Sequence, residues 1–151
     1  MNQTTPPGLM LTNLLVLATQ RHAGQYDKQG LPYILHCLKV MHYVKTEDEE
    51  LQCIAVGHDL IEDTKTTYAE LSEQCMSTRI IEGIRALTRV PGETESEYQT
   101  RVKSNPDAIK VKLADLRHNT DIRRLKGITD KDAARLRKYH KFYLELKELE
   151  T

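Results

Sequence analysis

Apolar residues recur at spacings of three and four positions along nearly the whole chain, and no run alternates apolar and polar residues over six or more positions. Spacings of three and four place apolar side chains on one face of a helix, whereas a half-buried strand requires alternation. The pattern therefore predicts an all-α fold.

The expected helices are separated by short segments rich in glycine, proline and polar residues. A threonine three residues before an acidic residue is the capping-box pattern, and it opens two helices, at Thr46 with Glu49 and at Thr67 with Glu70. An Asn–Pro pair at residues 105–106 opens a third, because Asn caps helices and Pro is favoured in their first turn. The predicted helices cover residues 9–25, 33–44, 49–63, 67–76, 78–87, 107–125 and 129–148, with a loop over residues 88–95.

Length and charge limit the possible functions. The chain has 151 residues, and its 22 lysines and arginines balance 22 aspartates and glutamates. A chain of about 150 residues can form one domain with its own core. Zero net charge argues against nucleic acid or an anionic membrane as the main partner. We expect a flexible polar lead-in over residues 1–8 and one domain over residues 9–151.

The three cysteines, Cys37, Cys53 and Cys75, are an odd number and form no Cys-x-x-Cys pair. They indicate neither a disulfide framework nor a zinc ribbon. The apolar run at residues 9–18 is too short to cross a bilayer. The expected location is therefore the reducing cytoplasm.

The most informative segment carries His58, Asp59, Glu62 and Asp63. On one continuous helix these positions fall within an arc of ~140°, so an imidazole and three carboxylates would share a face. Three carboxylates so close together repel one another, and a bound divalent cation would relieve that repulsion. A histidine next to an aspartate suits Mn²⁺, Fe²⁺ or Zn²⁺ better than an all-oxygen calcium site.

Two ligands are too few for such an ion, and further candidates are His36 and Asp115, each with apolar neighbours in the sequence. Taken alone, His36 would more often be a hydrogen-bonded core residue, and Asp115 would more often cap a helix or pair with Arg117, Lys112 or His118. Together with the segment at residues 58–63, they favour a metal site.

The order of these residues, His36, then His58 with Asp59, then Asp115, resembles the signature of the HD-domain metal-dependent phosphohydrolases. The similarity is closest to the hydrolase domain of the RelA/SpoT-type (p)ppGpp hydrolases and to the stand-alone small alarmone hydrolases. It extends over about residues 9–145 and rests on three motifs, ATQRHAGQYDKQGLPYILHCLKV (residues 18–40), HDLIEDT (58–64) and VKLADLRHNT (111–120).

The resemblance implies a single all-helical HD-domain bundle that binds one divalent ion, typically Mn²⁺, with Fe²⁺ or Zn²⁺ as alternatives. The implied ligands of the ion are His36, His58, Asp59 and Asp115. Glu62 and Asp63 would orient and deprotonate the attacking water, which is the role of a general base.

The resemblance also implies contacts to a nucleotide substrate from Lys28, Asn119, Arg135 and Tyr139. Alarmone hydrolases commonly carry a substrate-binding arginine after the Gly-Gln pair, whereas residues 26–28 of this chain are Tyr-Asp-Lys. Lys28 can meet a phosphate as a point charge but cannot form the two parallel hydrogen bonds of an arginine.

The function implied is that of a guanosine-3′,5′-bis(diphosphate) 3′-pyrophosphohydrolase, which converts ppGpp to GDP and pyrophosphate in the stringent response. The partner is then a small nucleotide, not a nucleic acid or a membrane, and the oligomeric state stays open. We expect no synthetase activity from 151 residues. Two alternatives remain: a hydrolase of another nucleotide or phosphoester, and a non-catalytic nucleotide-binding sensor.

A third possibility is nucleic-acid binding through the basic and aromatic segment RLRKYHKFY at residues 135–143. Tyr139, Phe142 and Tyr143 follow helical spacing, however, and therefore favour a core stripe. The neutral charge of the chain also disfavours this function.

Overall fold

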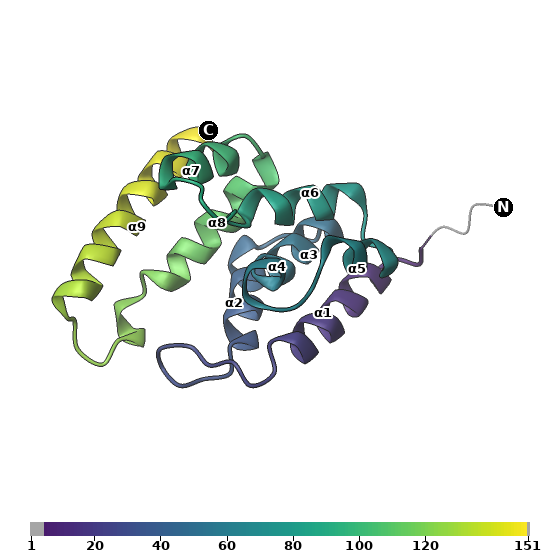
Figure 1. The fold of residues 1–151 in the computed structure, drawn as a ribbon, viewed down its shortest axis with the longest axis horizontal. Coiled ribbons are helices and arrows are strands. Elements are labelled where there is room, and N and C mark those ends of the chain that lie inside the picture. The colour runs from purple at the N-terminus through teal and green to yellow at the C-terminus, as the bar shows by residue number, and fades with distance from the viewer. Residues whose placement is uncertain (1–4, 151) are drawn as a thin grey trace.

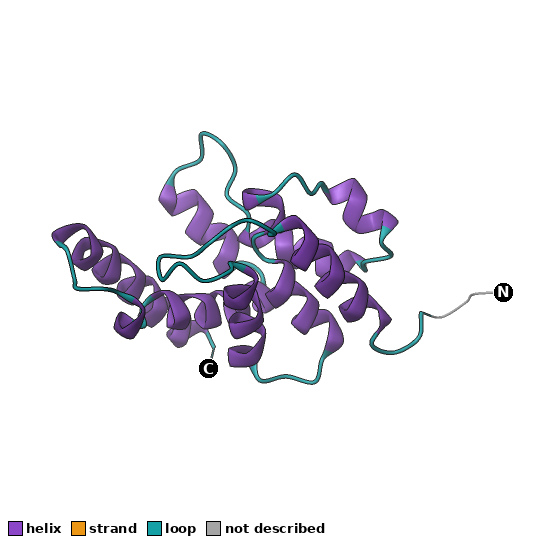
Figure 2. Ribbon diagram, turned by 90° about the horizontal axis from the view of Figure 1, so that it is seen from below, coloured by secondary structure: helices purple, strands orange, loops and turns teal. Residues whose placement is uncertain are grey.

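The computed structural model describes residues 5–150, and every regular element among them is a helix (Figure 1). Figure 2 shows these helices joined by loops, and an isolated antiparallel bridge links Tyr26 to Pro32. The predicted all-α fold is therefore confirmed. The elements are α1 (Leu9–Arg21), α2 (Ile34–Val44), α3 (Glu49–Gly57), α4 (Leu60–Asp63), α5 (Tyr68–Glu73), α6 (Thr78–Leu87), α7 (Glu95–Lys103), α8 (Pro106–Asn119), the short 3₁₀-helix η1 (Ile122–Arg124) and α9 (Asp130–Leu149).

Helix α3 lies at the centre of the bundle and packs against α1, α2, α6 and α8. Almost every residue of α3 from Leu51 onward is buried, because apolar or small side chains occupy the whole turn at residues 53–57. Helix α8 in turn packs against α2 and α9 (Figure 1). This arrangement places the C-terminal end of α3 and the middle of α2 and α8 inside the protein.

Two of the three predicted helix starts are confirmed. The side chain of Thr67 and that of Glu70 form a reciprocal capping box, and Asn105 accepts a hydrogen bond from the backbone N–H of Ala108. The prediction for Thr46 is wrong, because Asp48 caps α3 by accepting from the N–H groups of its first turn.

The prediction of a single helix over residues 49–63 is also wrong, because this segment is divided into α3 and α4. Asp59 lies between them with φ −107° and ψ 1°. The ring of His58 donates from Nδ1 to the carbonyl of Ala55 at 2.7 Å. In a continuous helix that carbonyl would accept from the backbone N–H of Asp59, so the His58 side chain takes the place of a helical hydrogen bond.

Three further helix ends differ from the prediction by three residues or more. The helix expected over residues 107–125 ends at Asn119 and is followed by η1, α1 ends at Arg21 instead of residue 25, and α5 ends at Glu73 instead of residue 76. Helix α7 follows the expected loop but was not predicted, since its buried residues are only Tyr98 and Val102. Two apolar positions one turn apart give too weak a period to identify a helix.

Of the predicted lead-in, residues 1–4 lie outside the described part of the chain. At the end of this segment, the backbone N–H of Gly8 donates to Glu49 at 2.9 Å and so connects the segment to α3. At the other end, Phe142 is buried and Tyr139 and Tyr143 pack against the core, as the core-stripe interpretation expects.

Within residues 5–150 no helix has the length and apolar character needed to span a membrane.

Candidate active site

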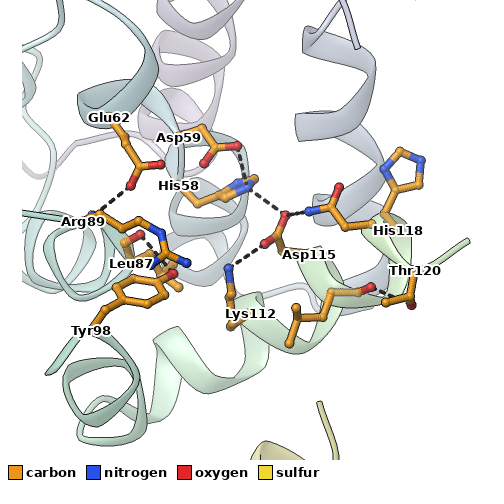
Figure 3. A network of polar contacts seen from close by, with 12 residues as sticks. His58, Asp59, Glu62, Leu87, Arg89, Tyr98, Lys112, Asp115, His118 and Thr120 are labelled. Atoms are coloured by element: carbon orange, nitrogen blue, oxygen red, sulfur yellow. Dashed lines mark hydrogen bonds and ion pairs between the residues drawn. The ribbon is translucent and has the colours of Figure 1, made fainter. Parts of the chain in front are cut away.

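Four side chains from α2, the α3–α4 junction and α8 point toward one another inside the bundle. The Nε2 atom of His36 lies 3.0 Å from Asp115 Oδ1 and 3.8 Å from Asp59 Oδ2. The Nε2 atom of His58 lies 3.0 Å from Asp59 Oδ2 and 3.4 Å from Asp115 Oδ1 (Figure 3). Residues that are 79 positions apart in the sequence, from His36 to Asp115, thus share one site.

The cluster has the chemistry of a metal site. Because a carbonyl only accepts hydrogen bonds, the bond from His58 to Ala55 fixes the ring proton on Nδ1 and leaves a lone pair on Nε2 when the ring is neutral. This Nε2 is buried and forms no well-aligned hydrogen bond among the described residues, although carboxylate oxygens of Asp59 and Asp115 lie 3.0 and 3.4 Å away. One ligand atom each from His36, His58 and Asp115 lies within 4.8 Å of the others, so the group could hold a metal ion.

The charges of the cluster favour a cation at its centre. Burial alone would raise the pKa of Asp115, but the Lys112 ammonium and both imidazoles hold it well below its usual value. Burial would lower the pKa of His58, but the Asp59 and Asp115 carboxylates raise it well above its usual value. The pKa of Asp59 is lowered to about 2 because His58 outweighs its burial. Positive charge, from a proton or a metal ion, is therefore stabilised between the carboxylates.

Neighbouring donors orient the two carboxylates, and Figure 3 shows Lys112 beside Asp115. The hydroxyl of Tyr33 donates to Asp59 Oδ2 at 2.5 Å. Lys112 Nζ lies 3.0 Å from Asp115 Oδ2, and Asn119 Nδ2 donates to Asp115 Oδ1 at 2.9 Å. With Oδ2 occupied by the lysine, Oδ1 is the oxygen that Asp115 turns toward the histidines.

The histidine ring of α2 also has a neighbour of its own. His36 Nδ1 lies 2.7 Å from His118 Nδ1, and the planes of the two rings are 19° from parallel with centroids 5.0 Å apart. Burial, followed by the charge of Arg124, lowers the pKa of His118 to about 4. Sequence reasoning considered His118 only as a possible partner of Asp115 and did not predict its contact with His36.

The two acids proposed for water activation border the cluster on its exposed side. Asp59, Glu62 and Asp63 each offer one oxygen within 4.8 Å of the others. Glu62 Oε1 accepts from the backbone N–H of Arg89 at 2.8 Å. Burial of its carboxylate, followed by the charges of Asp59 and Glu62, raises the pKa of Asp63 to about 6.

A cavity of about 350 Å³ opens beside the cluster. All four residues predicted to contact the substrate line it, together with the candidate ligand His36. The full lining comprises Tyr26, Asp27, Lys28, Tyr33, His36, Asn119, Asp121, Arg124, Leu125, Arg135 and Tyr139.

Carboxylates hold most of the cations in this cavity. Arg124 donates to Asp27 at 3.2 Å, and Arg135 donates to Asp132 at 2.6 Å. Lys28 is the loosest cation, since its side chain is 57% exposed and lies 3.9 Å from Asp132. Sequence reasoning missed Arg124, because 97 residues separate it from Asp27 and no local pattern signals the pairing.

Comparisons with known proteins show similarity of sequence and of fold. A family model described as HD domain matches residues 15–127. The guanosine-3′,5′-bis(diphosphate) 3′-pyrophosphohydrolase MESH1 of Danio rerio is 34% identical over 122 residues, which cover 73% of this chain and 67% of that protein. The enzyme of the same chemical name from Aquifex aeolicus is 31% identical over 107 residues, which cover 65% of this chain and 15% of that protein.

The fold has a solved counterpart as well. The structure of a metazoan orthologue of SpoT superposes with a TM-score of 0.76 at 22% identity, over 95% of this chain and 88% of that one. At this identity the likeness concerns the fold. The bacterial relatives are much longer than this chain, which matches 15% of the Aquifex aeolicus protein and 17% of its Haemophilus influenzae counterpart.

Proposed function

This chain belongs to the HD-domain family, and from that premise we propose that it is a metal-dependent phosphohydrolase that removes pyrophosphate from the 3′ position of ppGpp. The observation that carries the proposal is the buried cluster of His36, His58 and Asp115, which borders a cavity lined by basic and aromatic side chains. Support for the substrate comes from the names of the relatives. MESH1 of Danio rerio is named as a ppGpp 3′-pyrophosphohydrolase, and its match covers 73% of this chain.

We assign the metal to His36, His58, Asp59 and Asp115. Two nitrogen and two carboxylate ligands suit Mn²⁺ first, with Fe²⁺ and Zn²⁺ as alternatives. When bound, the divalent ion supplies Lewis-acid charge for a water molecule and a phosphate oxygen. The residues themselves contribute fixed orientation, because Tyr33, Lys112 and Asn119 already hold the two carboxylates.

Glu62 and Asp63 are proposed to orient the attacking water and take its proton. Both lie one turn after Asp59, and each offers an oxygen within 4.8 Å of an Asp59 oxygen. The N–H of Arg89 holds one oxygen of Glu62 and leaves the other free to accept a hydrogen bond from water. A positioned carboxylate of this kind typically contributes a factor of about 10² to 10⁴ in rate.

The nucleotide is proposed to bind in the cavity beside His36. Lys28 has the freest charge for a phosphate, and Arg135 and Asn119 line the same space. The ring of Tyr139 borders the cavity and offers a surface on which a base can stack.

One observation favours a different nucleotide as substrate. Asp27 lines the cavity at a position near which alarmone hydrolases commonly carry an arginine, and it holds Arg124 in an ion pair. A carboxylate there repels a phosphate and neutralises one of the cations that would otherwise bind it. Hydrolysis of a less highly charged nucleotide is therefore the second candidate.

We also propose a cytoplasmic location. The three cysteines are free, and Cys37 and Cys53 are buried, which fits a reducing compartment. The proposed partner is a small nucleotide, with no nucleic acid or membrane surface required.

The test is product analysis after incubation of Mn²⁺-loaded protein with ppGpp and with a panel of nucleoside mono-, di- and triphosphates. The Asp59→Ala variant serves as the inactive blank, and Glu73→Ala, which changes an exposed carboxylate on α5, serves as the matched control. Pyrophosphate and GDP from ppGpp support the proposal. Turnover of another nucleotide would keep the chemistry but refute the substrate, and full activity of Asp59→Ala would refute the metal site.

A further inference from the structure

The two histidines of the proposed metal site differ in what lies behind them. His58 donates from Nδ1 to the backbone carbonyl of Ala55, an acceptor that no side-chain change can remove. His36 has a side chain instead, since its Nδ1 lies 2.7 Å from His118 Nδ1. Both rings are buried, with 2% of His36 and 9% of His118 exposed.

The short distance requires one proton between the two nitrogens. A nitrogen of a neutral imidazole either carries a proton and donates or carries a lone pair and accepts. Two lone pairs or two protons at 2.7 Å would repel, so one of the two rings donates to the other. The distance alone does not fix the direction.

The metal-binding role proposed for the other nitrogen of His36 fixes it, because a bound ion replaces the proton that this nitrogen would otherwise share with Asp115. His36 Nε2 faces the cluster, 3.0 Å from Asp115 Oδ1 and 3.8 Å from Asp59 Oδ2. A histidine that binds a metal through Nε2 offers its lone pair there and carries its proton on Nδ1. His36 must then be the donor of the short hydrogen bond.

From this geometry we infer that His118 is a positioning residue that accepts the Nδ1 proton of His36, and that it thereby fixes both the tautomer and the ring orientation with which His36 binds the metal. The inference rests on the metal site of the proposed function. His118 does not touch the ion, and its effect passes through His36 alone.

The fold supports this role. His118 and Asp115 are three residues apart on α8, so one helix supplies a ligand and also the residue that orients a second ligand on α2. The backbone carbonyl of His118 accepts from Arg124 Nη1 at 3.0 Å, which fixes the end of α8 at this residue. The planes of the two rings are 19° from parallel and their centroids are 5.0 Å apart, so the two Nδ1 atoms face each other along the line between the rings.

The experiment compares two substitutions of the same shape. His118→Asn keeps an acceptor oxygen near the position of Nδ1, whereas His118→Leu has the same branching and no acceptor. His140→Phe, an exposed histidine on α9, is the control. Mn²⁺ affinity is measured by competition with a chelator, and urea unfolding in EDTA measures the stability of each metal-free variant.

We expect His118→Leu to weaken Mn²⁺ binding about 10- to 100-fold, as loss of such a partner typically does, and His118→Asn to restore most of the affinity. In Zn²⁺-loaded protein, the imidazole ¹H–¹⁵N spectrum should show a slowly exchanging Nδ1 proton on His36 in the unaltered chain and in His118→Asn. That proton should exchange rapidly in His118→Leu. A change of stability alone would not produce this pattern.

Equal Mn²⁺ affinity of His118→Leu and the unaltered protein would overturn the inference. Equal weakening by both substitutions would also overturn it, because the acceptor would then not matter. If the unaltered protein itself fails to bind the ion, the metal site of the proposed function is refuted and the role of His118 with it.

Discussion

The close packing of α6 on α3 makes Gly83→Ala an informative perturbation. A Cβ atom added at Gly83 would lie 2.5 Å from Ile54 Cδ1, 2.8 Å from its Cγ1 and 3.1 Å from its Cγ2. Ile54 is fully buried at the centre of the bundle, so it cannot move out into solvent to make room. The glycine inside α6 therefore allows the two helices to approach.

Two opposing effects set the size of the change. Replacing glycine by alanine inside a helix favours the folded state by about 1 kcal/mol. Overpacking of a well-filled core typically costs about 1–3 kcal/mol. Because three atoms of Ile54 obstruct the new methyl group, we expect the upper part of that range and a net loss of about 1–2 kcal/mol in the free energy of unfolding.

Urea unfolding in EDTA measures this loss without a contribution from bound metal. Glu82→Ala, an exposed change on the same helix, is the control and should stay within about 0.5 kcal/mol of the unaltered protein. Ile54→Val removes Cδ1, the closest atom, and should alone cost about 0.5–1.5 kcal/mol. The double variant should lose less stability than the sum of the two single losses, by at least about 0.5 kcal/mol.

A Gly83→Ala variant as stable as the unaltered protein would refute the argument, because glycine would then serve no packing purpose in α6. Strict additivity with Ile54→Val would refute it as well, since it would show that the added methyl group does not press on Ile54.

The remaining predictions concern the site and its surroundings. Glu62→Gln should retain Mn²⁺ but slow turnover by about 10²-fold or more in a steady-state assay; release of the ion would show that Glu62 is a ligand. Tyr33→Phe removes the donor to Asp59 and should weaken Mn²⁺ binding by about tenfold or more in a chelator titration; unchanged affinity would contradict the orienting role. Asp27 has a lowered pKa, since hydrogen bonds from the N–H groups of Leu31 and Gln29 and from Arg124 outweigh its burial. Its contribution to stability is therefore complete above about pH 4 and is lost as the pH falls further. Asp27→Asn should be less stable than the unaltered protein at pH 7, and the gap in thermal unfolding should narrow below about pH 4; a gap that stays constant with pH would contradict this.

Local signals made much of the helix order predictable from the sequence. Apolar periodicity and caps depend on residues three or four apart, as at Thr67 with Glu70 and at Asn105. The break before α4 was not predictable in this way. It depends on the His58 ring, which takes the carbonyl of Ala55, and periodicity does not record how a side chain bonds to the backbone.

The same distinction applies to the candidate site. Charged or imidazole side chains in apolar surroundings, such as His36 and Asp115, stand out in a sequence because isolated burial would be costly. Their supports do not stand out. The contact of His36 with His118 spans 82 residues and that of Asp27 with Arg124 spans 97, so only the folded chain brings these partners together.

The cavity itself suggests how substrate selection is divided between the metal and the protein. Arg124 and Arg135 are already paired with Asp27 and Asp132, so a phosphate can gain their full charge only by displacing a carboxylate. Lys28 is the cation with the fewest constraints, and it is largely exposed to solvent, where a single charge contributes little. Most of the attraction for an anionic substrate would then have to come from the divalent ion. The side chains of the cavity would decide which nucleotide fits rather than how strongly phosphate is held.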